Sequence, residues 1–200
     1  NGAAVQVQGS GAKISCTARR FDQGTLVSTG RHLDLAISGE GFFRVVGEDG
    51  AIYYTRDGSL HIDSGGRITN SRGHLLLDDE LPENHTDLVI DEKGNITYKD
   101  QEGARRELGQ IELHIFANPA GLEPVGENMF AVTETSGAPE NFTPGDENAG
   151  IIRQNYLESS NVDLVYETQT LIEAQRAFEL NARSVNTADQ LWSIANNLKK

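Results

Sequence analysis

The chain is poor in the residues that usually mark a secreted disulfide fold, a membrane protein or a nucleic-acid-binding protein. It has a single cysteine, Cys16, so no internal disulfide can form. Only 17 of its 200 residues are Lys or Arg against 30 Asp or Glu, and the net charge of -13 disfavours binding to nucleic acid or to anionic membranes. Its first residues have neither a basic start nor an apolar core, so we predict no signal peptide and no membrane insertion.

The residue patterns that would indicate an enzyme or a metal centre are also missing. The five histidines never lie four residues apart on a helix, and the spacing of metal ligands is absent: His32, His61, His74, His85 and His114. Asp91 opens a segment that superficially resembles a calcium loop, but Lys93 stands where an acidic ligand is needed. We therefore predict that the chain is not an enzyme and has no catalytic residue, bound metal or cofactor.

The most ordered pattern in the sequence lies at its carboxyl end. From residue 157 onward an apolar or aromatic residue recurs at every seventh position, and no Gly or Pro interrupts residues 161–200. A seven-residue repeat of this kind is typical of a helix that packs one stripe against another helix. We predict one long helix over residues 161–200 and, on it, a subunit interface formed by Leu164, Leu171, Phe178, Val185 and Trp192.

The predicted helix has no obvious partner in the rest of the chain. At about 1.5 Å per residue it would be roughly 55 Å long, and no second segment has a helical period of comparable length. We expect the stripe to pack against another polypeptide in a coiled-coil-like manner. The alternative is a single long helix that packs on its own domain.

Short strands and tight turns dominate the middle of the chain. Gly-containing turns recur every eight to twelve residues after Leu33, and Asp49-Gly50 and Asp57-Gly58 are dipeptides typical of hairpins. Residues 62–69 align without gaps on residues 90–97, with Gly66 and Gly94 at equivalent positions. Gly there predicts a repeated hairpin whose turn needs a left-handed backbone. Residues 108–116 are the longest predicted strand.

These patterns predict a mainly β fold with one long C-terminal α-helix. We expect an extended lead-in over residues 1–32 and a β-rich domain of short strands and hairpins over 33–135. A loop and return strand should follow over 136–160, and the helix over 161–200.

Several sequence motifs, taken in order, resemble those of a known family. They include Phe21-Asp22-Gln23-Gly24, Ser38-Gly39-Glu40-Gly41-Phe42-Phe43, Tyr54-Thr55-Arg56-Asp57-Gly58, Ala117-Asn118-Pro119, Ser136-Gly137-Ala138-Pro139, Leu157-Glu158-Ser159-Ser160-Asn161 and Gln175-Arg176-Ala177-Phe178-Glu179. Together they resemble the bacterial flagellar rod and hook family over residues 5–198. Residues 136–162 favour a distal-rod subunit over a proximal-rod or hook paralogue.

The resemblance implies a structural protein. Members of the family assemble into a helical homopolymer, the axial drive shaft that transmits torque to the hook, and they contact neighbouring rod and hook proteins and the surrounding basal-body rings. It implies a location in the flagellar basal body, outside the cytoplasmic membrane, after type III export without a cleaved signal peptide. It also implies a long helix that would precede Asn1. A rival interpretation is a cell-wall carbohydrate-binding or hydrolytic β module on a coiled-coil stalk.

Overall fold

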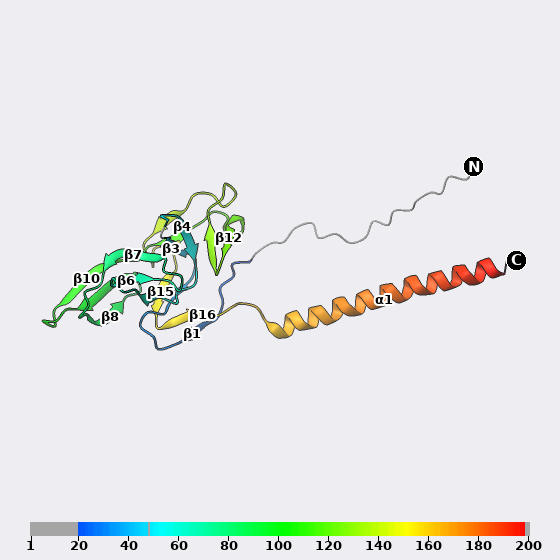
Figure 1. Cartoon of the computed structure of the whole chain (residues 1–200), viewed down its shortest axis with the longest axis horizontal. Coiled ribbons are helices and arrows are strands. Elements are labelled where there is room, and N and C mark those ends of the chain that lie inside the picture. Colours follow the sequence, from blue (N-terminus) through cyan, green and yellow to red (C-terminus); the bar gives the residue numbers. More distant parts are fainter. Residues whose placement is uncertain (1–19, 48, 199–200) are drawn as a thin grey trace. The chain divides into compact units, whose positions relative to one another are not determined.

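The computed structural model describes residues 20–47 and 49–198, and it divides the chain between Ser159 and Ser160. We call residues 20–159 the β unit and residues 160–198 the helical unit. The β unit consists of short antiparallel strands, and the helical unit contains one long helix (Figure 1). The predicted fold class is therefore confirmed. Of the predicted lead-in, residues 1–19 with Cys16 lie outside the described residues.

The described part of the β unit contains sixteen strands and one 3-10 turn, η1. In chain order they are β1 (Leu26–Ser28), β2 (Leu35–Ser38), β3 (Phe42–Val46), β4 (Ile52–Thr55), β5 (His61–Ile62), β6 (Arg67–Thr69), β7 (Leu75–Glu80), β8 (Thr86–Ile90), β9 (Asn95–Lys99), β10 (Arg105–Gln110), β11 (Leu113–Ile115), η1 (Pro119–Gly121), β12 (Glu123–Gly126), β13 (Met129–Ala131), β14 (Glu140–Phe142), β15 (Ile151–Gln154) and β16 (Tyr156–Glu158). The helical unit contains α1 (Leu164–Asn197).

Four antiparallel sheets build the β unit. The largest runs in the order β12-β13-β4-β3-β7-β6-β5, with β11 between β3 and β14 as a branch. A three-stranded sheet has the order β10-β9-β8, and two ribbons pair β2 with β15 and β1 with β16. The last two pairings join the start of the β unit to its end, so the chain enters and leaves it on adjacent strands (Figure 1).

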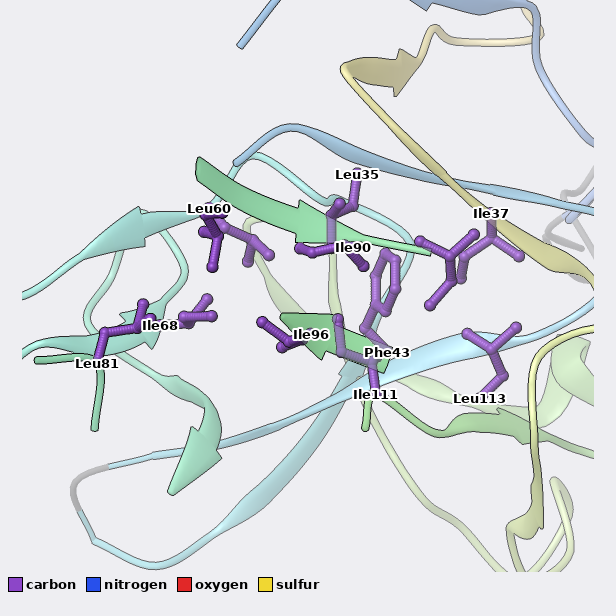
Figure 2. Close-up of a cluster of buried hydrophobic side chains, with 12 residues drawn as sticks. Leu35, Ile37, Phe43, Leu60, Ile68, Leu81, Ile90, Ile96, Ile111 and Leu113 are labelled. Atoms are coloured by element: carbon purple, nitrogen blue, oxygen red, sulfur yellow. The ribbon is translucent and has the colours of Figure 1, made fainter. Parts of the chain in front are cut away.

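One apolar core lies between these sheets. Phe43 on β3 is fully buried and lies among side chains from β2, β8 and β9, including Ile37, Ile90 and Ile96 (Figure 2). Ile111 and Leu113, which follow the three-stranded sheet, complete the same cluster. Contributions from segments so far apart in the sequence mean that the described β unit is held together by a shared core.

A second, aromatic cluster lies on the other side of β3. Successive side chains of a strand point to opposite faces, so Phe42 points away from the core that buries Phe43. Phe42 packs edge-to-face on Phe116, with ring centroids 5.7 Å apart, and Phe116 packs on Tyr54 at 4.9 Å. Edge-to-face contacts of this kind are favourable because the positive ring edge meets the negative ring face.

The hairpin turns repeat one design. In the turns that begin at Asp63 and Asp91, a side-chain oxygen of the Asp accepts hydrogen bonds from the backbone N–H groups two and four residues later. The Gly three residues after each Asp has a φ near +80°. The repeated hairpin predicted for these residues is confirmed. Asp91 acts as a turn residue, and its carboxylate accepts hydrogen bonds from backbone N–H groups of the same turn.

Two further turns follow the same design and were missed by sequence reasoning. Asn70 and Asp100 make the equivalent hydrogen bonds to N–H groups two and four residues later, and Gly73 and Gly103 have φ of +84° and +77°. The shared signal is Asp or Asn followed three residues later by Gly, a type I turn with a glycine bulge.

These turns make β5–β7 and β8–β10 two copies of one three-stranded meander. In each copy the residue after the third strand donates its N–H to the Gly carbonyl of the first turn, Leu81 to Gly66 at 2.8 Å and Ile111 to Gly94 at 2.9 Å. Leu81 and Ile111 are both buried in the shared core. The eight-residue repeat recognised in the sequence is thus the first turn of a larger structural repeat.

Two local predictions differ from the structure. Residues 108–116 form the end of β10 and then β11, because the chain leaves the three-stranded sheet at Ile111 and joins β3 at Leu113. Asp57-Gly58 is not a hairpin turn. Gly58 is needed for close packing: its carbonyl accepts a hydrogen bond from the Leu35 N–H at 3.0 Å, and a Cβ there would lie 1.9 Å from the Leu35 oxygen.

Candidate subunit interface

The long helix α1 has a defined start. Asp163 adopts an extended backbone, and its Oδ1 accepts hydrogen bonds from the N–H groups of Val165 at 2.9 Å and Tyr166 at 3.3 Å. This is the N-cap that satisfies two of the donors left unpaired at a helix start. Glu167 adds a negative charge in the first turn, where the helix dipole favours it. At 34 residues the helix is about 51 Å long.

All five predicted interface residues lie on α1 and are exposed. We call Leu164, Leu171, Phe178, Val185 and Trp192 the first stripe; their exposed fractions run from 58% to 78%. Across Leu164–Asn197, which the structure describes in full, no residue is buried. The structure therefore brings these side chains onto one helix at heptad spacing, but it does not show what they pack against.

A second set of apolar residues on α1 was missed by sequence reasoning. The second stripe consists of Leu180, Leu191 and Ile194 on α1 and of Leu198 at its C-cap; these residues are 57% to 83% exposed. Their spacings of 11, 3 and 4 residues are those of one helix face and could have revealed it. At 3.6 residues per turn the second stripe lies roughly 130° around the helix from the first.

Small residues lie between the two stripes. Ala174, Ala188 and Ala195 come three residues after members of the first stripe, on the arc that faces the second stripe. The arc resembles a groove with two ridges of large side chains and a floor of the three Ala methyl groups, interrupted by the polar side chains of Glu167 and Asn181. Such a floor allows a neighbouring helix to approach closely, while the ridges provide the contact area.

A polar column also runs along α1, outside the arc between the two stripes. The column takes every seventh residue, and each of its side chains carries an amide or a positive charge: Gln169, Arg176, Arg183, Gln190 and Asn197. By helix geometry this column lies about 160° from the first stripe. The two stripes and the polar column therefore lie on different sides of the helix, so neighbouring helices could cover the stripes while the column meets water.

Two specific features are absent from the part of the chain that the structure describes, a metal-binding cluster and a membrane-spanning helix. Over residues 20–47 and 49–198, no group of three or more His, Cys, Asp or Glu side chains could hold a metal ion. The same part of the chain has no helix that is both long and apolar enough to cross a membrane.

The perturbed carboxyl groups have structural causes. The backbone N–H of Arg67, the side chain of Arg67 and the N–H of Gly65 hold the pKa of Asp63 below its usual value. A hydrogen bond from the Arg106 guanidinium is the main reason why the pKa of Asp100 is lowered. A turn hydrogen bond is thus the main cause of the lowered pKa of Asp63, whereas the ion pair with Arg106 is the main cause of the lowered pKa of Asp100.

Comparison with known proteins agrees with this geometry. Residues 36–98 match the family model of the flagellar hook protein FlgE/F/G D1 domain, and residues 153–198 match that of the flagellar basal body rod FlgEFG protein C-terminal region. The chain is 43% identical to the flagellar basal-body rod protein FlgG of Borreliella burgdorferi, over 96% of its length and 74% of the relative's. It is 39% identical to those of Agrobacterium fabrum (96% and 74%) and Caulobacter vibrioides (98% and 75%).

The chain therefore belongs to the flagellar hook and basal-body rod family. The fold fits this class, since a mostly β unit and a terminal helix with an exposed apolar face are parts of an assembling structural protein. Within the family, it is a structural rod subunit of the FlgG, or distal-rod, type. The resemblance predicted from the sequence motifs is confirmed, and the family is a structural one without enzymatic activity, which argues against the hydrolytic alternative.

Proposed function

We propose that α1 is the element through which this rod subunit assembles, with the first stripe as its main contact. The proposal is supported by the exposure of Leu164, Phe178 and Trp192 on a helix whose sequence keeps an apolar heptad over its whole length. In a straight helix a seven-residue stripe drifts by about 20° per heptad. A left-handed supercoil with a neighbouring helix would therefore keep all five side chains in contact.

The second stripe extends this proposal to a second neighbour. An apolar arc of roughly 130° is wider than the narrow seam of a two-stranded coiled coil. We expect each α1 to contact two neighbouring helices, one on each ridge, with the alanine floor between them. If these contacts are head-to-tail and do not close into a ring, they generate a helical filament. The polar column then faces water.

Repeated self-association would make the subunit part of the drive shaft that transmits torque to the hook. The β unit, which includes the β-rich domain predicted over 33–135 and the return strand predicted over 136–160, would supply lateral contacts. Neighbouring rod and hook proteins and the basal-body rings are the further partners that we expect. Export by the type III apparatus, without a cleaved signal peptide, would bring the protein outside the cytoplasmic membrane.

The experiment that tests the helix interface introduces charge into the first stripe. We expect Phe178→Asp with Val185→Asp in the complete gene product to abolish rod assembly, because two carboxylates would have to be buried without partners. Rods isolated from cells and swimming on soft agar measure the result. Circular dichroism of the purified protein should show the β unit still folded.

A matched variant places the same charges on the polar column. Gln169→Asp with Gln190→Asp adds two carboxylates to α1 at exposed sites, so rods should form normally. A third variant, Leu180→Asp with Ile194→Asp, tests the second stripe and should also prevent assembly. Normal rods with the Phe178 and Val185 changes would refute the proposed interface, and normal rods with the Leu180 and Ile194 changes would limit it to the first stripe.

A further inference from the structure

Glu158 is the last residue of β16 and lies only six residues before α1 begins, and its carboxylate binds two distant segments of the β unit. Its Oε2 lies 2.8 Å from Nε of Arg56, and its Oε1 accepts a hydrogen bond from the Gly24 N–H at 2.8 Å. The side chains of Arg56 and Glu158 are only 16% and 11% exposed. An ion pair so little exposed is far less screened by solvent than a surface pair.

Arg56 connects this carboxylate to a third part of the chain. Its guanidinium also donates to the carbonyl oxygens of Gly39 at 3.2 Å and Gly41 at 3.0 Å, in the turn between β2 and β3. Arg can do this because its planar head carries five N–H donors in a fixed arrangement. A single side chain thus ties the outgoing strand β16 to the turn that precedes the central strand of the large sheet.

The incoming segment is held at the same place by two side chains that precede β1. The Gln23 amide spans the edge of β2, because its Nε2 donates to the Ile37 carbonyl at 2.9 Å and its Oε1 accepts from the Gly39 N–H at 3.1 Å. Phe21 packs edge-to-face on Phe42 and Phe130, with ring centroids 5.5 and 5.2 Å apart. Phe21 thereby joins the aromatic cluster on the outer face of the large sheet.

The strand pair that these contacts flank is short. β1 and β16 pair over three residues, Leu26 with Glu158 to Ser28 with Tyr156, extended by the Ser159 N–H to Thr25 oxygen bond of 2.9 Å. A two-stranded ribbon alone is marginally stable at best. The side-chain contacts around it are therefore needed to keep the incoming and outgoing segments together.

We propose that Phe21, Gln23, Arg56 and Glu158 form a clasp that keeps the incoming and outgoing segments joined to the β unit when torque acts on the subunit. The proposal rests on the proposed role of the rod in torque transmission. Force carried by α1 reaches the β unit through residues 159–163 and β16, so β16 is where the ribbon would be pulled open. The clasp distributes that force over Arg56, the β2–β3 turn and the incoming segment, which must all give way together.

Amide hydrogen exchange of the whole chain tests the clasp itself. Glu158→Gln keeps the side-chain shape but removes the charge that Arg56 requires. We expect amides in residues 25–29 and 155–159 to exchange about tenfold faster, while those of β3 and β9 keep their rates. The matched control is Glu92→Gln, which removes an exposed ion pair between Glu92 and Arg153 of similar length, 2.7 Å. This change should leave the exchange rates of the ribbon unchanged.

Swimming under load tests the role of the clasp in torque. Cells whose complete gene product carries Glu158→Gln should assemble rods and swim normally in dilute medium, but slow at least about twofold more than wild type in viscous medium, where motor torque is larger. Unchanged amide exchange would overturn the clasp. Faster exchange with normal swimming in viscous medium, or the absence of rods, would overturn its role in torque. Failure of the wild-type protein to enter rods would instead refute the proposed function, whatever the exchange rates.

Discussion

Two phenylalanines show how differently the two units of this chain are stabilised. Phe43 in the β unit is completely buried, whereas Phe178 in α1 is 75% exposed. The β unit buries large apolar side chains in its own core, through contacts between strands that are distant in the sequence. The helix makes its backbone hydrogen bonds and a few side-chain hydrogen bonds within itself, but it buries none of its apolar side chains. In the proposed function a subunit folds first and assembles afterwards, and the exposed side chains of α1 are the part that assembly would cover.

The difference between the two units is tested most directly by replacing each of these phenylalanines with alanine. Phe43→Ala should lower the free energy of unfolding by about 3–5 kcal/mol, because it leaves a cavity in the core. Phe178→Ala in the isolated chain should change it by less than about 0.5 kcal/mol, as exposed substitutions usually do. Urea unfolding followed by circular dichroism measures both. A large loss of stability with Phe178→Ala would mean that the helix is covered by its own chain.

A second pair of variants compares two turns within the β unit. Gly94 and Gly103 have similar φ, +82° and +77°, but a Cβ at Gly94 would lie 2.4 Å from the Ile111 oxygen, and one at Gly103 would meet nothing within 4 Å. Gly103→Ala should cost about 1 kcal/mol, the strain of a left-handed alanine. Gly94→Ala should cost about 2–4 kcal/mol, because it also breaks the bond that closes the meander. Equal costs would show that the close approach is unimportant.

The smallest predicted effect is a pH dependence of the β unit. Burial lowers the pKa of His114, whose ring packs 5.3 Å from that of Tyr54; Glu112 opposes this shift and Arg44 adds to it. Because the folded state binds the proton less well than the unfolded chain, stability should fall as the pH drops below about 6.5, the usual His value. Carboxyls with lowered pKa, such as Asp63, lose their contribution only at lower pH.

Urea unfolding at pH 7.5 and pH 5.5 measures this effect. Wild type should lose stability between pH 7.5 and pH 5.5, and His114→Leu should reduce that loss. His61→Leu, a change at an exposed histidine, should show the same loss as wild type. Identical pH dependence in wild type and His114→Leu would show that His114 is not the group responsible.

Local patterns in the sequence were enough to predict several elements. The unbroken heptad predicted α1, and the repeat of residues 62–69 at 90–97, with Gly three residues after Asp in each copy, predicted the turns at Asp63 and Asp91, because a helix period and a turn type depend on neighbouring residues alone. The same spacing at Asn70 and Asp100 was present but overlooked. Of the proposed interface, the heptad indicated only the first stripe, since the second follows an irregular spacing of 11, 3 and 4 residues.

Contacts between distant segments could not be predicted. The pairing of β1 with β16 joins residues about 130 positions apart, and nothing in either strand specifies the other. The break at Ile111 likewise depends on the Gly94 carbonyl that Ile111 contacts, so the local run of alternating residues suggested one strand where there are two.

The amino-acid sequence by itself thus determined the periodic elements of this protein and its membership of the rod family, since both are encoded in local spacing and motif order. Only the tertiary structure decided that Phe21, Arg56 and Glu158 meet beside one short ribbon. The physical reason is that such a meeting depends on the path of the whole chain around a shared core, which no short stretch of residues specifies.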